Sequence, residues 1–319
     1  MRHPLGELRA IETADGSLSL HSDHFDEAFH SSTGALEEAE AKFVRPAELE
    51  TFSQHSELKL LDVCFGMGYN SAAIMRSLPP ASHPRLQWWG LELDPRPLGW
   101  GLGHKPFREL WPSGVLQRLE QLQRSGRWCD RGGHGSMLWG DARHNLKKLP
   151  GGCQLDLILL DAFSPVHCPQ LWSEEFLAAL ASRLAPGGRL LTYCRAAAVR
   201  SSLRRAGLTL RSLLPAKGER AEWSSGTLAL KPRTNKALAA EGPGWTSLSA
   251  MEEEHLNTRA SVPYRDPHGD DEAVSIQRRR ELEQQSCDLE STSLWHRRWR
   301  SHVLTNRPST RPESDDKQR

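Results

Sequence analysis

Two closely spaced glycines and a set of carboxylates follow apolar runs in this 319-residue sequence, at positions where they could contact a ligand. The run LKLLDVCF leads directly into Gly66 and Gly68, and glycines so close together allow the backbone to turn sharply or to lie against a bound molecule. Three later apolar runs end in acidic residues: Glu92 or Asp94, Asp141, and Asp161. Carboxylates accept hydrogen bonds from hydroxyl and amino groups. The pattern therefore predicts a site for a ligand that carries such groups.

The apolar runs themselves predict the strands that would carry these residues. Five runs suit buried strands: residues 58–65, 85–95, 136–142, 155–165 and 189–194. Helical patterns lie between or beside them: residues 34–44, 70–78, 173–188 and 197–208. Repeated strand–helix units predict an α/β fold with a doubly wound, mostly parallel sheet. Because ligands bind at the carboxyl ends of parallel strands, the glycines and carboxylates should meet at that edge.

Two helix ends can be predicted from local signals. Ser32 or Thr33 is expected to cap the helix at 34–44, which carries acidic residues in its early turns. The helix at 173–188 is expected to end at the run Pro186, Gly187 and Gly188, since proline and glycine terminate helices.

Composition narrows the classes of protein. The formal net charge is +1, so any contact with nucleic acid must come from local basic patches. The six cysteines form no CxxC pair and the histidines have no paired ligand spacing, which argues against a disulfide framework and predicts no metal. Neither a secretory signal nor a run of about 20 apolar residues is present. We therefore expect a soluble, cytoplasmic protein without a membrane partner.

Changes in composition divide the chain into four parts. Residues 1–57 form an N-terminal extension, and residues 58–231 form the domain built on the parallel sheet. Residues 232–305 are more polar and are expected to form a C-terminal helical appendage, with helices near 277–286 and 291–304. Residues 306–319 lack an apolar anchor, so we expect a disordered tail.

The glycine loop distinguishes between classes of ligand. A dinucleotide-binding loop has the pattern GxGxxG, but Ser71 stands at the third glycine position, which weakens the phosphate interpretation. A carboxylate after the second strand suits ribose hydroxyls, and Asp141 after the third suits an adenine amino group. This is the layout of a nucleoside site without a phosphate, as for S-adenosyl-L-methionine (SAM). A tight turn without ligand, with the acids serving as helix caps, remains the alternative.

The same stretches resemble a known family, the MnmC-type methyltransferases that complete the 5-methylaminomethyl group of the tRNA wobble uridine. The carrying segments are SDHFDEAFHS, LDVCFGMGYN, LELDP, WGDA and, most specifically, LLDAFSPVHCPQLWSEEFLAALASRLAPGGRLLTY. The resemblance covers residues 10–230 and implies a Rossmann-like SAM-dependent methyltransferase with N-terminal and C-terminal additions. It also implies tRNA as partner and a functional link to the enzymes that install the aminomethyl group. The family also occurs fused to an oxidase domain, and this chain resembles the stand-alone form.

The resemblance assigns roles to particular residues. It implies that Asp161 is catalytic, because a carboxylate beside an amine can accept an N–H hydrogen bond and stabilise the charge that develops on nitrogen. It prefers Glu92 to Asp94 for the ribose. The expected cofactor-binding residues are Asp62, Gly66, Gly68, Tyr69, Asn70, Glu92, Asp141 and Ala142. The expected substrate-binding residues are Phe163, Pro165 and Trp172. For Asp62, Tyr69 and Asn70, holding the loop or starting the helix are equally open roles.

Two further functions and a set of possible RNA contacts stay open at this point. One alternative is an aminopropyltransferase of the spermidine-synthase kind, and the other is a SAM-fold RNA-binding protein without catalysis. Arginines could contact tRNA phosphates: Arg195, Arg200, Arg204, Arg205, Arg278 to Arg280, Arg297, Arg298 and Arg300. Trp295 and Trp299 share one face of a predicted helix and are expected to dock the appendage.

Overall fold

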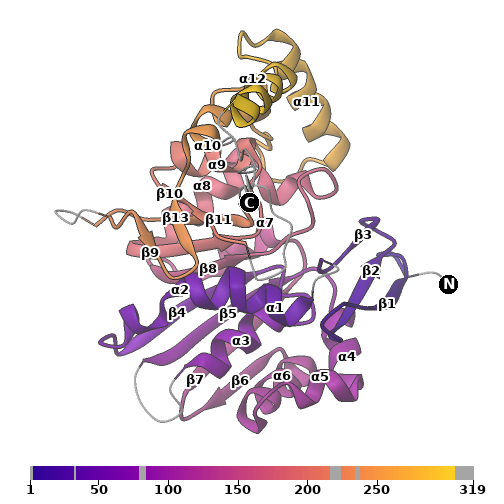
Figure 1. The fold of residues 1–319 in the computed structure, drawn as a ribbon. Helices are drawn as coiled ribbons and strands as arrows, with labels where there is room; N and C mark the ends of the chain where they lie inside the picture. The colour runs from indigo at the N-terminus through magenta and orange to yellow at the C-terminus, as the bar shows by residue number, and fades with distance from the viewer. Residues whose placement is uncertain (1–2, 32–33, 79–83, 216–223, 234–237, 306–319) are drawn as a thin grey trace, which may run out of the picture.

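The computed structural model describes residues 3–31, 34–78, 84–215, 224–233 and 238–305, with side chains described up to residue 299. Its centre is a ten-stranded sheet with strand order β12-β13-β10-β11-β9-β8-β4-β5-β7-β6 (Figure 1). The five middle strands are parallel: β4 (Glu57–Val63), β5 (Arg85–Glu92), β7 (Gly133–Trp139), β8 (Leu155–Leu160) and β9 (Leu184–Thr192). The predicted parallel sheet is confirmed. The chain continues to β5 and β7 on one side of β4 and to β8 and β9 on the other, so β4 and β8 flank the switch point.

Antiparallel strands extend both edges of the sheet beyond the predicted runs. They are β6 (Arg127–Asp130), β10 (Thr209–Leu213), β11 (Gly226–Leu230), β12 (Glu241–Gly242) and β13 (Trp245–Ser247). The last two belong to the segment 232–305, which was expected to be helical. They are only two and three residues long, too short to give a periodic signal in the sequence.

Helices cover both faces of the sheet. The α-helices between β4 and β10 are α3 (Tyr69–Ser77), α4 (Arg96–Gly103), α5 (Lys105–Glu109), α6 (Ser113–Ser125), α7 (Ala142–Asn145), α8 (Glu174–Arg183) and α9 (Ala197–Arg205). Adjacent residues of β4 face opposite sides: Leu60 packs in the cluster that contains α3 and α6, and Leu61 in the cluster that contains α8 and α9. This alternation follows from the pleat and makes the fold doubly wound, as predicted.

The α8 helix ends earlier than the sequence suggested. It stops at Arg183, and strand β9 begins at Leu184 and runs through Pro186, Gly187 and Gly188. The helix therefore ends three positions before Pro186, and the predicted end at the Pro-Gly-Gly run is wrong by that much. The run instead lies at the start of the strand, where Gly187 has a positive φ of 84°.

The N-terminal extension forms a small antiparallel sheet and a helical segment beside the main sheet (Figure 1). Its strands are β1 (Leu8–Glu12), β2 (Leu18–Ser22) and β3 (Glu27–Ala28). The predicted helix at 34–44 is a succession of α1 (Ala35–Ala39), a π-helical turn (Glu40–Val44) and α2 (Arg45–Ala47). Gly34 occupies the N-cap position, and the expected caps Ser32 and Thr33 lie outside the described residues.

The C-terminal segment ends in helices that lie at one end of the molecule, coloured orange to yellow in Figure 1. They are α10 (Ala250–His255), α11 (Ala273–Ser286) and α12 (Thr292–Thr305). Trp295 is buried and stacks on His255 of α10, with ring centroids 4.4 Å apart, and Trp299 donates to Glu254. The tryptophans therefore hold α12 against α10. The tail at 306–319 lies outside the described residues.

Every helix in the described segments is too short or too polar to span a membrane.

Candidate active site

A cavity of about 580 Å³ opens at the carboxyl edge of the parallel strands. Strand ends supply one wall through Gly66, Glu92, Asp141 and Asp161, and the N-terminal extension supplies another. A cavity of this size falls in the range of small-molecule sites. The edge that the sequence singled out therefore carries a cavity of ligand size.

The glycine loop lies against Glu92. The carboxylate of Glu92 accepts from the amide of Gly66 at 2.7 Å and from the amide of Asp94 at 2.9 Å. Its burial raises its pKa above the usual value, while these amide hydrogen bonds act in the opposite direction. Each carboxylate oxygen can accept two hydrogen bonds, so Glu92 retains capacity for a ligand hydroxyl.

The loop backbone explains why glycines stand here. Gly66 and Gly68 have φ values of 57° and 92°, in the region that side chains disfavour. A Cβ at Gly68 would lie 2.5 Å from the ring of Phe65, and one at Gly66 would lie 3.3 Å from the ring of Phe29. Gly68 is therefore required by packing inside the loop, whereas Gly66 faces the cavity.

Asp141 lies at the end of β7 and caps α7 by accepting from the amide of Arg143 at 2.8 Å. The guanidinium of Arg143 also contacts this carboxylate, with Nη2 2.7 Å from Oδ2. Although burial opposes it, hydrogen bonds from Arg143 hold the pKa of Asp141 below its usual value. Asp141 and Ala142 both line the cavity, as expected for residues beside a ligand.

Asp161 lies at the end of β8 and lines the opposite part of the same wall. The side-chain amide of Asn70 donates to its Oδ2 at 2.7 Å. Burial and the negative charge of Glu38 raise the pKa of Asp161 to about 8. The carbonyl of Ala162, a second possible acceptor for an amine, accepts from the hydroxyl of Tyr193 at 2.9 Å.

Aromatic rings, two of them from the N-terminal extension, line the same cavity as Asp161. Phe163 stacks on Phe25 with ring centroids 4.4 Å apart and meets Phe29 edge-on at 5.0 Å. Trp172 is fully buried outside the cavity, and its indole N–H donates to the carbonyl of Phe163 at 2.7 Å. Trp172 therefore holds the loop from behind, and Pro165 lies in the same loop without lining the cavity.

Several residues that were expected to bind the cofactor are buried and do not line the cavity. Asp62 is fully buried and accepts from Ser71 at 2.6 Å, and burial raises its pKa to about 7. Tyr69 is buried in the core, where its hydroxyl donates to the carbonyl of Leu18 at 2.9 Å. Asn70 donates to Asp161 and is not among the described residues that line the cavity. Among the expected residues, the cavity thus brings together Gly66, Glu92, Asp141, Ala142, Asp161 and Phe163.

The N-terminal extension adds cavity residues that the sequence did not single out. Lys42 and Glu38 form an ion pair of 2.6 Å in which both side chains are largely buried. Glu27 also lines the cavity and accepts from the amide of Ser164 at 3.0 Å. The i, i+4 spacing of Glu38 and Lys42 was a visible signal, but such pairs are usually solvated helix faces.

The arginines proposed for tRNA contact differ in burial and in their ion-pair partners. Arg200 is buried and pairs with Glu252 at 2.9 Å, so it is not an RNA contact. Arg204 pairs with Glu253 and Arg205 with Glu174, both at the surface. Arg298 pairs with Glu254 and Glu290, and the side chain of Arg300 lies outside the described part.

The lining fits a nucleoside ligand that carries a positive charge. Glu92 and Asp141 offer acceptors for hydroxyl and amino groups, and Leu93, which is 40% exposed, adds an apolar surface to the lining. The cavity is rich in carboxylates, which favours a cationic ligand such as the sulfonium of SAM.

Comparisons with known proteins agree with this chemistry. Residues 110–228 match the family described as S-adenosyl-L-methionine-dependent methyltransferase. The chain is 32% identical over 203 residues to the tRNA 5-methylaminomethyl-2-thiouridine biosynthesis bifunctional protein MnmC of Azoarcus sp. (strain BH72), covering 59% of this chain and 31% of that protein. It is 28% identical over 262 residues to the protein of the same name from Ralstonia nicotianae, covering 78% and 38%.

A solved structure gives the same result over nearly the whole chain. The crystal structure of MNMC2 from Aquifex aeolicus superposes with a TM-score of 0.72 at 25% identity, covering 90% of this chain and 88% of that one. The chain spans about half the length, or less, of the curated relatives that it matches. Fold, family match and relatives agree with the expected cofactor: residues 110–228 match the S-adenosyl-L-methionine-dependent methyltransferase family, and the chain is similar to methyltransferases of the MnmC type.

Proposed function

We propose that the chain transfers a methyl group to the 5-aminomethyl nitrogen of the tRNA wobble uridine, giving 5-methylaminomethyluridine. The observation that carries this proposal is the carboxylate of Asp161, which lines the cavity beside aromatic rings and has a pKa raised to about 8. The tRNA and the modification are those in the names of the MnmC relatives, which support the proposal.

The acceptor nitrogen must be neutral to attack a methyl group. An alkylamine resembles lysine, whose pKa is about 10.4, so it arrives largely as an ammonium ion. A carboxylate with a pKa near 8 is better matched to take that proton than an ordinary aspartate, since proton transfer is most efficient between groups of similar pKa. Asp161 would also accept an N–H hydrogen bond and so direct the nitrogen lone pair.

The cofactor end is assigned to the other strand ends. We assign the ribose to Glu92, the adenine amino group to Asp141 with Ala142, and the close backbone contact to Gly66. SAM, when bound, supplies a methyl group on a positively charged sulfur. The acceptor base is assigned to Phe163, because stacking of a base on an aromatic side chain contributes about 1–3 kcal/mol. A base in such a cavity has to leave its stack in the anticodon loop.

A transfer assay tests the proposal. The substrate is tRNA purified from cells that install the aminomethyl group but lack this methylation step, and mass spectrometry of the nucleosides identifies the product. We expect 5-methylaminomethyluridine to form with SAM, and no product with tRNA that lacks the aminomethyl group.

Two control reactions separate the alternatives. Replacing SAM by decarboxylated SAM should give no aminopropyl transfer to the tRNA or to a free polyamine. Transfer of an aminopropyl group, or SAM binding without any methylated nucleoside, would reject the proposed reaction.

A further inference from the structure

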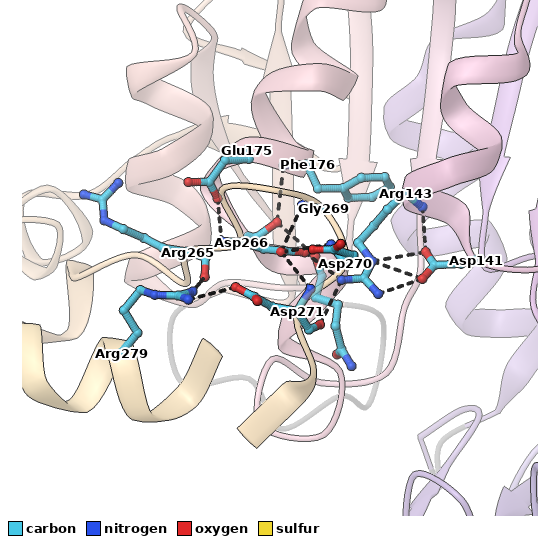
Figure 2. A network of polar contacts seen from close by, with 12 residues as sticks. Asp141, Arg143, Glu175, Phe176, Arg265, Asp266, Gly269, Asp270, Asp271 and Arg279 are labelled. Atoms are coloured by element: carbon cyan, nitrogen blue, oxygen red, sulfur yellow. Dashed lines mark hydrogen bonds and ion pairs between the residues drawn. The ribbon is translucent and has the colours of Figure 1, made fainter. Parts of the chain in front are cut away.

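A network of charges connects the cofactor end of the cavity to the loop before α11 (Figure 2). Arg143 lies between two carboxylates in this network. Its Nε lies 3.1 Å from each oxygen of Asp141, and its Nη2 lies 2.7 Å from Oδ2 of the same group. On the other side, its Nη1 donates to Oδ2 of Asp266 at 2.6 Å and to the carbonyl of Asp271 at 2.9 Å.

Asp266 is held in place by its own loop. It is fully buried, and its Oδ1 accepts from the amides of Gly269, Asp270 and Asp271 at 3.1 to 3.2 Å. Its own amide donates to Glu175 of α8 at 2.8 Å. The loop thus presents one carboxylate oxygen to Arg143 and uses the other to close its own turn.

These contacts account for the acidic cluster at this place. Oxygens of Asp266, Asp270 and Asp271 lie within 4.8 Å of one another, a grouping that could suggest a cation site. The positive charge is supplied instead by Arg143 to Asp266 and by Arg279 to Asp271, the latter at 2.8 Å. The cluster is therefore explained by arginine, and it carries no metal proposal.

The geometry has a consequence for Asp141. An arginine side chain is flexible. If Arg143 were paired with Asp141 alone, the guanidinium and the carboxylate could each take several orientations. Arg143 is anchored on its far side by a fully buried carboxylate, so the guanidinium plane is fixed and with it the orientation of the Asp141 carboxylate. A planar guanidinium that binds a carboxylate through two nitrogens is well suited to fix direction.

We infer that Asp266 is a positioning residue for the cofactor site, which acts through Arg143 to orient the carboxylate of Asp141 toward the adenosine part of SAM. The inference rests on the proposed role of Asp141. It implies that the loop before α11, residues 266–271, supports the cofactor site. The segment 232–305 then contributes to cofactor affinity without lining the cavity.

The test is Asp266→Asn, because asparagine retains an oxygen for the three loop amides and loses the charge that holds Arg143. SAM affinity is measured by calorimetry without tRNA, so the result does not depend on the identity of the acceptor. We expect the Kd for SAM to rise about tenfold, as for the loss of roughly 1.4 kcal/mol. The KM for SAM should rise more than kcat falls, and the melting temperature should change little.

Asp270→Asn is the matched control. Asp270 belongs to the same cluster and is exposed, and it contacts Asp266 through its backbone amide. Its substitution removes the same unit of charge from the same loop, so SAM affinity should stay at the wild-type value. An equal loss of affinity in both variants would mean that only the net charge of the loop matters, and would overturn the inference.

A double-mutant cycle with Asp141→Asn identifies the route. If Asp266 acts through Asp141, the effect of Asp266→Asn should be largely lost in the Asp141→Asn background. A full tenfold effect in that background would overturn the inference, because Arg143 would then act on the ligand itself. Weakened binding in Asp141→Asn with unchanged binding in Asp266→Asn would reject the inference and keep the site. Unchanged binding in both would reject the role of Asp141 as well.

Discussion

Asp141 and Asp161 follow two parallel strands at the same edge of the sheet, and their surroundings shift the pKa of the two carboxyl groups in opposite directions. Asp141 is paired with Arg143, and hydrogen bonds from that residue keep its pKa low although burial opposes this. Asp161 accepts from the neutral amide of Asn70, and burial together with Glu38 raises its pKa to about 8. Two carboxylates with the same position in the fold are thus set for different chemistry.

The difference indicates a division of the cavity into two ends. A carboxylate that stays ionised is a constant hydrogen-bond acceptor, which suits the neutral hydroxyl and amino groups of a nucleoside. A carboxylate that titrates near neutral pH can take up and release a proton, which suits an amine that must lose one before it reacts. Widely separated pKa values within one site are a common basis for assigning acid–base roles.

The largest expected effect is at the acceptor end. Asp161→Ala should lower kcat by about 10²–10⁴, because it removes the group that accepts the amine proton. SAM affinity should stay within about threefold of the wild-type value, since the assigned ribose and adenine contacts remain. Asp161→Asn should fall between the two, as it keeps an acceptor and loses the charge. Methyl-transfer assays with saturating tRNA measure kcat, and calorimetry measures the affinity for SAM. Wild-type turnover in Asp161→Ala would rule out the catalytic role.

A change at the cofactor end should give the opposite pattern. Glu92→Ala removes the acceptor assigned to the ribose, and losing a hydrogen bond to a charged group costs about 1.5–3 kcal/mol. The Kd for SAM should therefore rise on the order of tenfold to a hundredfold. Equilibrium binding with and without tRNA checks this result.

A second variant controls for damage to the loop. Glu92 also accepts from the amides of Gly66 and Asp94, so its loss could disturb the backbone. Glu92→Gln keeps an acceptor for one of these amides and should recover part of the affinity. If Glu92→Ala bound SAM normally, the ribose role would pass to Asp94.

The sequence predicted the half of the site that lies on strand ends. Glu92, Asp141 and Asp161 follow apolar runs, and parallel strands bring their carboxyl ends to one edge, so the meeting of these residues followed from the pattern alone. Glu38 and Lys42 lie in a helical segment before the sheet domain, and only the folded extension brings them to the cavity. No local pattern distinguishes such a buried pair from a solvated one.

Residues beside the glycine loop show a second limit of the sequence. Tyr69 follows Gly68 directly and was expected near the cofactor, yet its ring points into the core toward Phe107 and Trp111. The direction of a side chain at the first turn of a helix depends on how the helix docks. Asp266 was missed for another reason: it lies 123 positions after Arg143 in the chain, and only the folded structure brings the two residues together.

A stability measurement tests the comparison without substrate. Asp161 has a folded-state pKa of about 8 against an ordinary value of 3.8, so the folded protein binds more protons between these values. Its contribution to the free energy of unfolding should therefore fall as pH rises through that window. Asp161→Asn removes this penalty, and the variant should gain roughly 1–3 kcal/mol over the wild type between pH 5 and pH 8.5, reduced from the full shift because the group opens onto the cavity.

The same substitution at Asp141 should act in the other direction. The pKa of Asp141 is lowered in the folded state, so its contribution is present above the unfolded pKa and is lost as pH falls. Asp141→Asn should therefore destabilise the protein near neutral pH and have less effect in acid. Denaturant titrations of both variants at several pH values would show two slopes of opposite sign, and equal slopes would contradict the division of the cavity.

The smallest expected effect concerns the ion pair of Glu38 and Lys42. Glu38 raises the pKa of Asp161 and Lys42 lowers it, so removing either charge should move the titration in a known direction. Glu38→Gln should lower the pKa of Asp161 and shift the acid limb of the kcat/KM profile to lower pH. Lys42→Met should shift it to higher pH, each by one unit or less, on the order of a Coulomb interaction in a partly solvated site. The acceptor amine titrates equally in all three proteins, so the difference between profiles isolates Asp161. Shifts of the same sign in both variants would mean that the limb belongs to another group, and that the proton is not taken by Asp161.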